Sequence, residues 1–218
     1  MSFDRLAPWY RWMELLCAGQ KLQRGRIAFL GQIPPPRHIL LPGEGHGRTL
    51  RECRRRFPEA RITCVDASAG MIAQARRQFA RHEPATGQIE FIHADLLHWT
   101  PPARAYDLII THYFLDCFRP EQLAQLIPRL AAAATPEANW LLADFQIPPA
   151  GLPRWRSQLI LWSLYVFFRA VTRLPARRLT PPDAFLQAAG FTRRRRLIME
   201  WGLLHSDWWF KFKYEKTR

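Results

Sequence analysis

The sequence predicts an α/β protein with one mostly parallel sheet and helices on both faces. Between residue 37 and about residue 147, short apolar runs alternate with segments of helical periodicity, which is the pattern of strand–helix–strand units. The expected strands are apolar along much of their length, as parallel strands buried on both faces tend to be. Two further β-rich runs near the C-terminus are close enough to form an antiparallel hairpin at the sheet edge. The sheet is therefore expected to have seven strands.

The elements follow one another along the chain at short intervals. Two N-terminal helices are expected over 3–19 and 22–33, before the proline run 34–36. The expected strands are 37–41, 61–68, 88–95, 106–114, 139–147, 193–201 and 207–216. The expected helices between them are 47–57, 69–82, 120–134, a long one within 152–174, and 181–191. Ser68 is a candidate N-cap for the helix that follows it, and 202–206 is expected to be the hairpin loop. We expect a single domain over 1–218.

Charge and cysteine content restrict the function less than the alternation of strands and helices restricts the fold. The net charge of +14 comes from 28 arginines and four lysines scattered along the chain, so it is as consistent with a compositional bias as with a binding surface. The run Arg193–Arg196 is dense enough to contact an anion. Four widely spaced cysteines and the lack of a secretory signal pattern favour a cytoplasmic protein.

A glycine-rich loop follows the first expected strand. Gly43, Gly45 and Gly47 lie where that strand meets a helix, and such loops let the backbone approach a ligand closely. Asp66 ends the second strand about 20 residues later, where a carboxylate can accept hydrogen bonds from ribose hydroxyls. Asp95 ends the third strand at the same edge of the sheet. The three positions together predict a site for a nucleotide-like cofactor.

These motifs resemble those of the class I S-adenosylmethionine-dependent methyltransferases, which have a Rossmann-like fold. "ILLPGEGHG", "VDASAGMIAQAR", "FIHADLLHW" and "YDLIITHYFLDCF" are similar to the first four motifs of that family, so the likeness extends over nearly the whole chain. The opening "FDRLAPWYRWMELL" resembles the start of the quinone-pathway and related small-molecule methyltransferases, in which N-terminal helices cover the active site. Residues 1–33 are then an N-terminal helical cap.

The resemblance assigns a cofactor site for S-adenosylmethionine, which becomes S-adenosylhomocysteine. The glycine loop would lie under the methionine part, Asp66 would hold the ribose, and Asp95 with the backbone of Leu96 would meet the adenine. The cofactor-binding residues implied in this way are Gly43, Glu44, Gly45, Gly47, Asp66, Ala67, Met71, Asp95, Leu96 and His112. Family members usually carry an acid two places before the first glycine, where this chain has Leu41. Glu44 is the nearby carboxylate that would take over its role with the cofactor's amino group.

Methyl transfer from a sulfonium is an in-line displacement that needs an aligned nucleophile and, for a hydroxyl or acidic carbon, a base. His112, Tyr113 and Asp116 follow the fourth strand and are the candidates for these roles. His112 fits the base role best from its ordinary pKa, although a histidine there can equally serve as a hydrogen-bonding partner within the fold. His205 and Asp207, expected in the hairpin loop, are weaker candidates.

Residues 151–179 form a helical insertion at a position where related enzymes place substrate-binding elements. Its apolar stretch 157–168 has about a dozen residues, whereas a membrane-spanning helix needs about 20. Arginines flank it, as in an interfacial helix. We predict a small lipophilic or aromatic acceptor, with Tyr10, Trp162, Tyr165 and His205 as substrate-binding residues. Peripheral membrane contact through 157–168, a core role and a homodimer all remain open for this helix.

Other function classes have weaker support. An RNA or DNA methyltransferase would suit the charge, but "THYFLDCF" lacks the Asn/Asp-Pro-Pro-Tyr type of sequence found in enzymes that methylate exocyclic base amines. A non-catalytic relative is suggested by Leu41. Nicotinamide chemistry is disfavoured because Arg48 stands where its third glycine would be. His46, His93 and His98 lack paired ligand spacing, so no metal site is expected.

Overall fold

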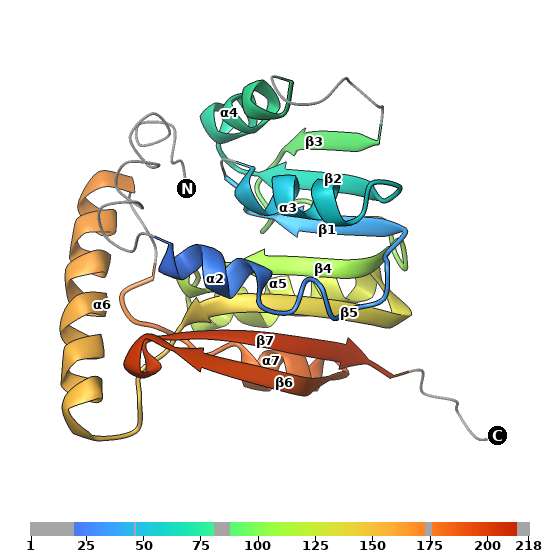
Figure 1. Cartoon of the computed structure of the whole chain (residues 1–218). Coiled ribbons are helices and arrows are strands. Elements are labelled where there is room, and N and C mark those ends of the chain that lie inside the picture. Colours follow the sequence, from blue (N-terminus) through green and yellow to red (C-terminus); the bar gives the residue numbers. More distant parts are fainter. Residues whose placement is uncertain (1–19, 46, 81–87, 173–175, 213–218) are drawn as a thin grey trace.

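The computed structural model describes residues 20–45, 47–80, 88–172 and 176–212. Seven strands form one sheet in the order β3-β2-β1-β4-β5-β7-β6 (Figure 1). The first five strands in this order are parallel, and β7 runs antiparallel to both β5 and β6. The strands are β1 (His38–Pro42), β2 (Arg61–Asp66), β3 (Ile89–His93), β4 (Tyr106–His112), β5 (Ala134–Phe145), β6 (Phe191–Met199) and β7 (Leu204–Lys211). The predicted mostly parallel sheet with a C-terminal antiparallel pair is confirmed.

Helices cover both faces of the sheet and its carboxyl edge. They are α2 (Lys21–Ile27), α3 (Arg48–Arg56), α4 (Ala69–Ala80), α5 (Pro120–Ala133), α6 (Gly151–Thr172) and α7 (Asp183–Ala188), with 3₁₀ turns η1 (Leu115–Cys117) and η2 (Glu200–Gly202). On one face, side chains of β4 and β5 such as Ile109 and Trp140 are buried against α5. On the other face, β1 and β4 pack with Phe29, Leu50 and Cys53. The two apolar layers explain why the central strands read as nearly continuous apolar runs.

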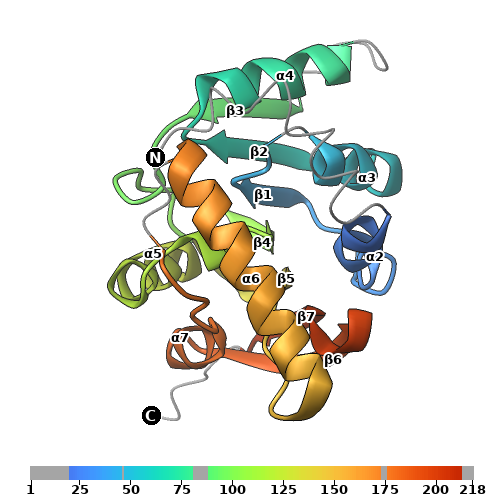
Figure 2. The ribbon, with the colours of Figure 1, turned by 90° about the vertical axis from the view of Figure 1, so that its left-hand side faces the viewer.

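Helix α6 lies across the edge of the sheet at which the parallel strands end (Figures 1 and 2). One face of the helix is buried through Ser157, Leu161, Tyr165 and Thr172. Leu161 and Tyr165 pack in a small apolar cluster with Leu22 of α2 and Leu204 of β7. Helix α6 therefore lies beside the ends of β4 and β5.

Several element bounds differ from those expected. The expected loop 202–206 is wrong in part, because residues 204–206 belong to β7, and the connection is instead made by η2. Glu200 and Trp201 have φ of 53° and 58°, a conformation that non-glycine residues rarely adopt and that the sequence does not signal. β5 begins five residues earlier than expected, α2 is shorter than 22–33, and α7 spans six residues. The expected helix over 3–19 lies outside the described residues.

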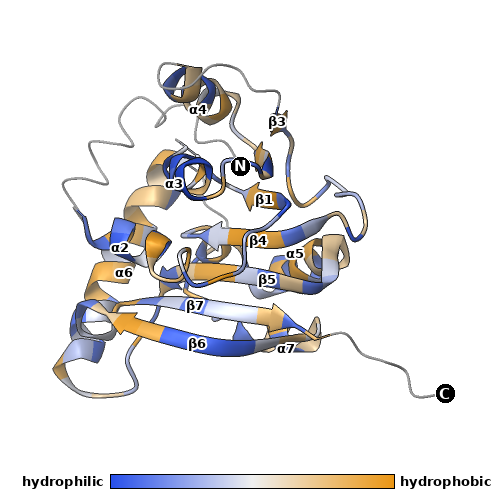
Figure 3. Cartoon of the chain, turned by 45° about the vertical axis from the view of Figure 1, so that its right-hand side comes forward, coloured by the Kyte–Doolittle hydropathy of each residue, from blue (hydrophilic) through white to orange (hydrophobic). Residues whose placement is uncertain are grey.

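The run Arg193–Arg196 lies in β6, a strand at the edge of the sheet whose hydrophilic colouring is visible in Figure 3. Its members have partners within the protein. Arg196 donates to both carboxylate oxygens of Asp207, and Arg194 stacks at 4.1 Å over the ring of Phe210. Charged side chains on an edge strand also discourage pairing with another chain. These contacts give the run a role in the fold and weaken its interpretation as a phosphate-binding patch.

Candidate active site

The glycine loop turns sharply between β1 and α3. Gly43 donates from its amide to the carbonyl of Val65 at 2.7 Å, which fixes the loop to the end of β2. Gly43 has a φ of 66°, and a Cβ there would lie 2.1 Å from the Phe114 ring. Gly45 has a φ of 64°, but its nearest neighbour on that side is the Sδ of Met71 at 3.9 Å. Gly43 is therefore required by packing, whereas Gly45 presents its backbone to open space beside Met71.

Asp66 joins the glycine loop to the start of α4. Its Oδ2 accepts a hydrogen bond from the Gly45 amide at 3.1 Å, and its Oδ1 accepts one from the Ser68 amide at 2.8 Å. The Ser68 hydroxyl in turn accepts the amide of Met71 at 3.2 Å, so Ser68 is the N-cap that the sequence predicts. Ala67, partly exposed, follows directly, and its carbonyl lies 3.1 Å from Nε2 of His93. The Asp66 carboxylate thus links the glycine loop to the start of α4 at the carboxyl end of β2.

Asp95 lies just beyond β3, next to Asp66 along the sheet edge. The amide of Ala94 donates to the Asp66 carbonyl at 3.0 Å, which ties the two strand ends together. The Asp95 side chain is 44% exposed and accepts the amide of Leu97 at 3.0 Å. Leu96 is buried. Asp95 can therefore reach a ligand at this edge without leaving its turn.

Glu44 lies within the glycine loop and caps α3. Its Oε1 accepts the Leu50 amide at 3.0 Å, in the first turn of the helix. Burial raises the pKa of Glu44 to about 7, although the hydrogen bond from Leu50 and the nearby charge of Arg26 oppose the rise. This contact with the helix was not foreseen from the sequence, which treats Glu44 as a cofactor ligand.

Arg26 is a site residue that the sequence did not single out. It lies on the buried side of α2, with 9% of its surface exposed, and its guanidinium lies 5.0 Å from the centre of the Tyr113 ring. The positive charge of Arg26 acts to lower the pKa of both Glu44 and His112. Nothing in the sequence distinguishes Arg26 among 28 arginines. It follows Gly25, where a Cβ would lie 2.5 Å from the Tyr113 hydroxyl. That glycine lets α2 approach the end of β4.

His112 lies against α3, and Tyr113 lies against α2. The Nδ1 of His112 lies 3.5 Å from the Thr49 hydroxyl, and the Tyr113 hydroxyl donates to the Leu22 carbonyl at 3.2 Å. Burial, and then the charge of Arg26, lower the pKa of His112 to about 3. His112 is consequently neutral near pH 7 and is costly to protonate.

Two carboxyl groups lie at the ends of β4 and β5. Asp116 lies in η1, and burial raises its pKa to about 6. Asp144 is 1% exposed, and burial followed by the charge of Asp116 raises its pKa well above the usual range. One oxygen of Asp144 accepts the Phe145 amide at 2.8 Å, while Oδ2 has no hydrogen-bond partner among the described residues. The sequence analysis missed Asp144, because it is embedded in an apolar strand.

The predicted substrate-binding residues are not all brought together. The Tyr165 hydroxyl donates to the Asp116 carbonyl at 3.1 Å, so Tyr165 lies beside the two carboxyl groups. Trp162 lies on the outer side of α6 and is 66% exposed. His205 is 2% exposed in β7, with its Nδ1 3.3 Å from the Asp207 carboxylate, so the expected loop location of this pair is wrong. Tyr10 lies outside the described residues.

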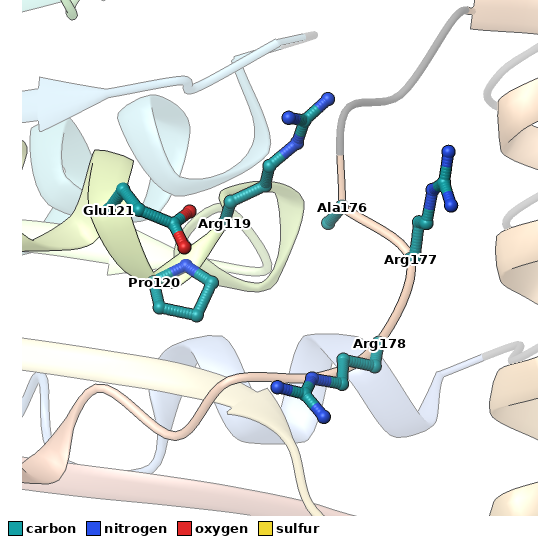
Figure 4. A pocket seen from close by; sticks show the side chains of 6 residues that line it. All are labelled: Arg119, Pro120, Glu121, Ala176, Arg177 and Arg178. Carbon is teal, nitrogen blue, oxygen red and sulfur yellow. The ribbon is translucent and has the colours of Figure 1, made fainter.

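A pocket opens between the start of α5 and residues 176–178 (Figure 4). It is lined by Arg119, Pro120, Glu121, Ala176, Arg177 and Arg178. Three guanidinium groups and one carboxylate give the pocket a net positive lining.

The histidines considered as metal ligands are separate from one another. His93 lies against the Ala67 carbonyl, His98 has its Nδ1 3.3 Å from the Asp95 carboxylate, and His46 is not among the described residues. Within the described ranges, no group of three or more His, Cys, Asp or Glu side chains is arranged to hold a metal ion.

Comparison with known proteins finds a family match over the region that contains these residues. Residues 39–137 match the family described as "Methyltransferase domain". A trans-aconitate 2-methyltransferase of Rhodopseudomonas palustris is 41% identical over 75 residues, which are 34% of this chain and 27% of that protein. A tRNA1(Val) (adenine(37)-N6)-methyltransferase of Vibrio parahaemolyticus is 38% identical over 71 residues, which are 33% of this chain and 29% of that protein. The matches thus span less than a third of either relative.

Solved structures share the fold over nearly the whole chain. One is the 1,6-didemethyltoxoflavin-N1-methyltransferase of Burkholderia thailandensis with bound 1,6-didemethyltoxoflavin and S-adenosylhomocysteine. It has a TM-score of 0.63 and 16% sequence identity, covering 96% of this chain and 86% of that one. At this identity the likeness concerns the fold, which is the Rossmann-like fold expected from the sequence.

Proposed function

The chain belongs to the class I S-adenosylmethionine-dependent methyltransferases, and we propose that it transfers a methyl group to a small lipophilic or aromatic acceptor. The products are the methylated acceptor and S-adenosylhomocysteine. The observation that carries the proposal is the Asp66 carboxylate, which holds the Gly45 amide at 3.1 Å beside the open side of that glycine. A carboxylate that ends a strand next to an open glycine backbone suits a ribose and the groups attached to it.

The residues present fit the cofactor at several points. The open space at Gly45 is bordered by Met71, which offers an apolar surface, and Asp95 is exposed enough to accept a hydrogen bond from an amino group. Arg26 provides a buried positive charge near Glu44, where a ligand carboxylate would be stabilised. We therefore assign Arg26 to the methionine end of the cofactor, opposite the Asp66 end.

The cofactor, when bound, supplies an electrophilic methyl group on a sulfonium. A lone pair of the acceptor forms the new bond to the methyl carbon while the carbon–sulfur bond breaks, and an acceptor hydroxyl or amine must also lose its proton. A general base works best when its pKa lies near the operating pH. Asp116, with its pKa raised to about 6, meets this condition better than His112, with a pKa of about 3. We assign removal of the acceptor's proton to Asp116 and a positioning role to His112.

The acceptor is expected to carry no large negative charge. Asp144 lies buried and Asp116 partly buried at the strand ends, and a further anion beside them would be repelled. An acceptor with a hydroxyl or amine can instead donate to the unpartnered Oδ2 of Asp144. Around them, Leu161, Phe145 and Tyr165 contribute apolar surface. A polycarboxylate such as trans-aconitate fits this lining less well than a neutral aromatic alcohol or amine.

Titration calorimetry with S-adenosylmethionine and S-adenosylhomocysteine tests the proposal. We expect micromolar binding by the wild type and a loss of at least tenfold in Asp66→Asn, since one ionised acceptor for the ribose is removed. Glu59→Gln, at an exposed position before β2, is the matched control and should bind as the wild type does. Absence of binding by a folded wild type, or equal binding by Asp66→Asn, would refute the proposed site.

A further inference from the structure

Helix α6 exposes an apolar stripe along its outer side. The stripe consists of Leu152, Trp155, Leu159, Trp162 and Val166, which are 83%, 73%, 66%, 66% and 50% exposed. The spacing of three and four residues places all five on one side of a helix with about 3.6 residues per turn. The opposite side holds the buried Ser157, Leu161 and Tyr165, so the stripe faces away from the protein.

The stripe continues onto the neighbouring turn. Trp201 in η2 is 77% exposed, and the Arg156 guanidinium lies 5.8 Å from the centre of its ring. Arg156 also donates to the Glu200 carbonyl at 3.4 Å, which fixes η2 against α6. Three exposed tryptophans therefore lie on or beside one helix. Large exposed apolar surfaces on a monomer normally mark an interaction site.

Cations border the stripe, and anions are absent from the helix. Arg156 and Arg169 lie at the two sides of the stripe by helical position, and both are exposed. No Asp or Glu occurs between Gly151 and Thr172. The whole chain carries a net charge of +14. An apolar face with tryptophan and leucine, bordered by arginine, is the composition of a helix that lies in a membrane interface.

We propose that this face of α6 docks on an anionic lipid surface, with the helix lying in the plane of the interface. None of the described helices is both long and apolar enough to cross a bilayer, so the contact is peripheral. A second copy of this chain is a poorer occupant, because α6 carries arginines and no carboxylate, and Glu200 of the adjoining η2 is already paired with Lys21. Phosphate groups of lipid would pair with Arg156 and Arg169 while the tryptophans enter the headgroup region.

Co-sedimentation of the full chain with vesicles tests the contact. The wild type should bind vesicles of phosphatidylcholine with phosphatidylglycerol and bind pure phosphatidylcholine at least tenfold less. The double variant Leu159→Glu/Trp162→Glu should lose about tenfold or more in bound fraction, since two apolar side chains are replaced by charges repelled by the lipid. Ile198→Glu is the matched control: Ile198 is 58% exposed but lies in β6, and this variant should bind normally.

Tryptophan fluorescence places the contact on the helix. Brominated acyl chains should quench the wild type more than Trp155→Phe/Trp162→Phe at equal bound fraction. No binding to anionic vesicles, or equal binding by the Leu159→Glu/Trp162→Glu variant, would overturn the proposal. A dimer seen by light scattering and broken by that double variant would likewise overturn it, by assigning the stripe to a second copy. Cofactor affinity, measured separately, should be unchanged in these variants, so the two proposals fail independently.

Discussion

The carboxyl group of Asp144, at the end of β5, lies within electrostatic reach of Asp116, which follows β4 in η1. Burial is the larger cause of the raised pKa of Asp144, and the charge of Asp116 adds to it. Two such groups compete for ionisation, so at neutral pH the pair can retain a proton on Asp144 while Asp116 is ionised. One carboxylate is then available as a base and one carboxylic acid as a donor or acceptor.

A pH profile of methyl transfer examines the role of Asp116. Since its pKa is raised to about 6, kcat/KM should rise with pH through about 6 and level off above it. Asp116→Asn should lower kcat by about 10²–10⁴-fold and abolish this limb. Cofactor affinity, followed by calorimetry, should stay within about twofold. A limb that persists in Asp116→Asn would assign the titration to another group.

Asp144→Asn should stabilise the protein increasingly as the pH rises. Folding raises the pKa of Asp144, so the native state retains a proton that the unfolded chain releases, and stability falls from the unfolded pKa upwards through the folded one. Asparagine has the same shape and no charge, so the Tm difference between variant and wild type should grow between pH 5 and pH 8. Glu59→Gln, at an exposed site, is measured alongside as the control substitution of a surface carboxylate. A constant difference for Asp144→Asn would contradict the raised pKa.

Two alanine substitutions in the glycine loop separate packing from ligand binding. Both glycines have positive φ, so alanine at either should cost about 1–2 kcal/mol of unfolding free energy. Gly43→Ala also meets the Phe114 ring at 2.1 Å, and overpacking should add about 1–3 kcal/mol. Gly45→Ala meets open space, so its further loss should appear in cofactor affinity.

Urea denaturation and calorimetry on the two variants provide the comparison. Gly43→Ala should be the less stable protein, and Gly45→Ala should bind S-adenosylmethionine at least tenfold more weakly than the wild type. Equal stability of the two variants would mean that Phe114 can move aside, and wild-type affinity in Gly45→Ala would mean that the cofactor does not approach this glycine.

The parts of the fold that the sequence predicts well are those with strong periodicity. The strands β1, β2 and β4 are continuous apolar runs closed by glycine, aspartate or histidine, and they end within two residues of the expected positions. Ser68 illustrates a local rule that held, because its hydroxyl caps α4 as its type and position predict. The hairpin before β7 was misplaced, since its turn uses Glu200 in a left-handed conformation that residue preferences disfavour.

The site was predictable where a motif defines it and not where tertiary contacts do. Asp66 was placed correctly at the strand end because its spacing from the glycines is itself the signal. Arg26 and Asp144 gave no such signal, because each acquires its role from burial against elements distant in sequence. The pKa of His112 also depends on Arg26 in another helix, which is why the sequence favoured histidine as the base.

Glu44→Gln distinguishes the cap of α3 from a cofactor ligand. The Gln side-chain oxygen can still accept the Leu50 amide, so stability near pH 5 should stay close to that of the wild type. Folding raises the pKa of Glu44 to about 7, so wild-type stability should fall relative to the variant as the pH rises from about 4.5 to 7. If Glu44 also binds the cofactor's amino group, calorimetry at pH 8 should show weaker binding by the variant. Unchanged cofactor affinity in the variant would mean that Glu44 only caps α3.

Asp207→Asn should be among the most destabilising single substitutions in the chain. Burial alone would raise the pKa of Asp207, but the hydrogen bonds from Arg196 outweigh it and lower the pKa. Asp207 is fully buried and Arg196 only partly exposed, so removing the carboxylate leaves a buried cation and should cost about 3–5 kcal/mol. Asp183→Asn, which removes the more exposed partner of Arg196, should cost about 1 kcal/mol or less. Because a lowered pKa stabilises the fold above the unfolded value and the benefit is lost on acidification, the penalty of Asp207→Asn in urea denaturation should shrink as the pH falls below about 4. A penalty that does not depend on pH would show that the lost interaction is packing and not charge.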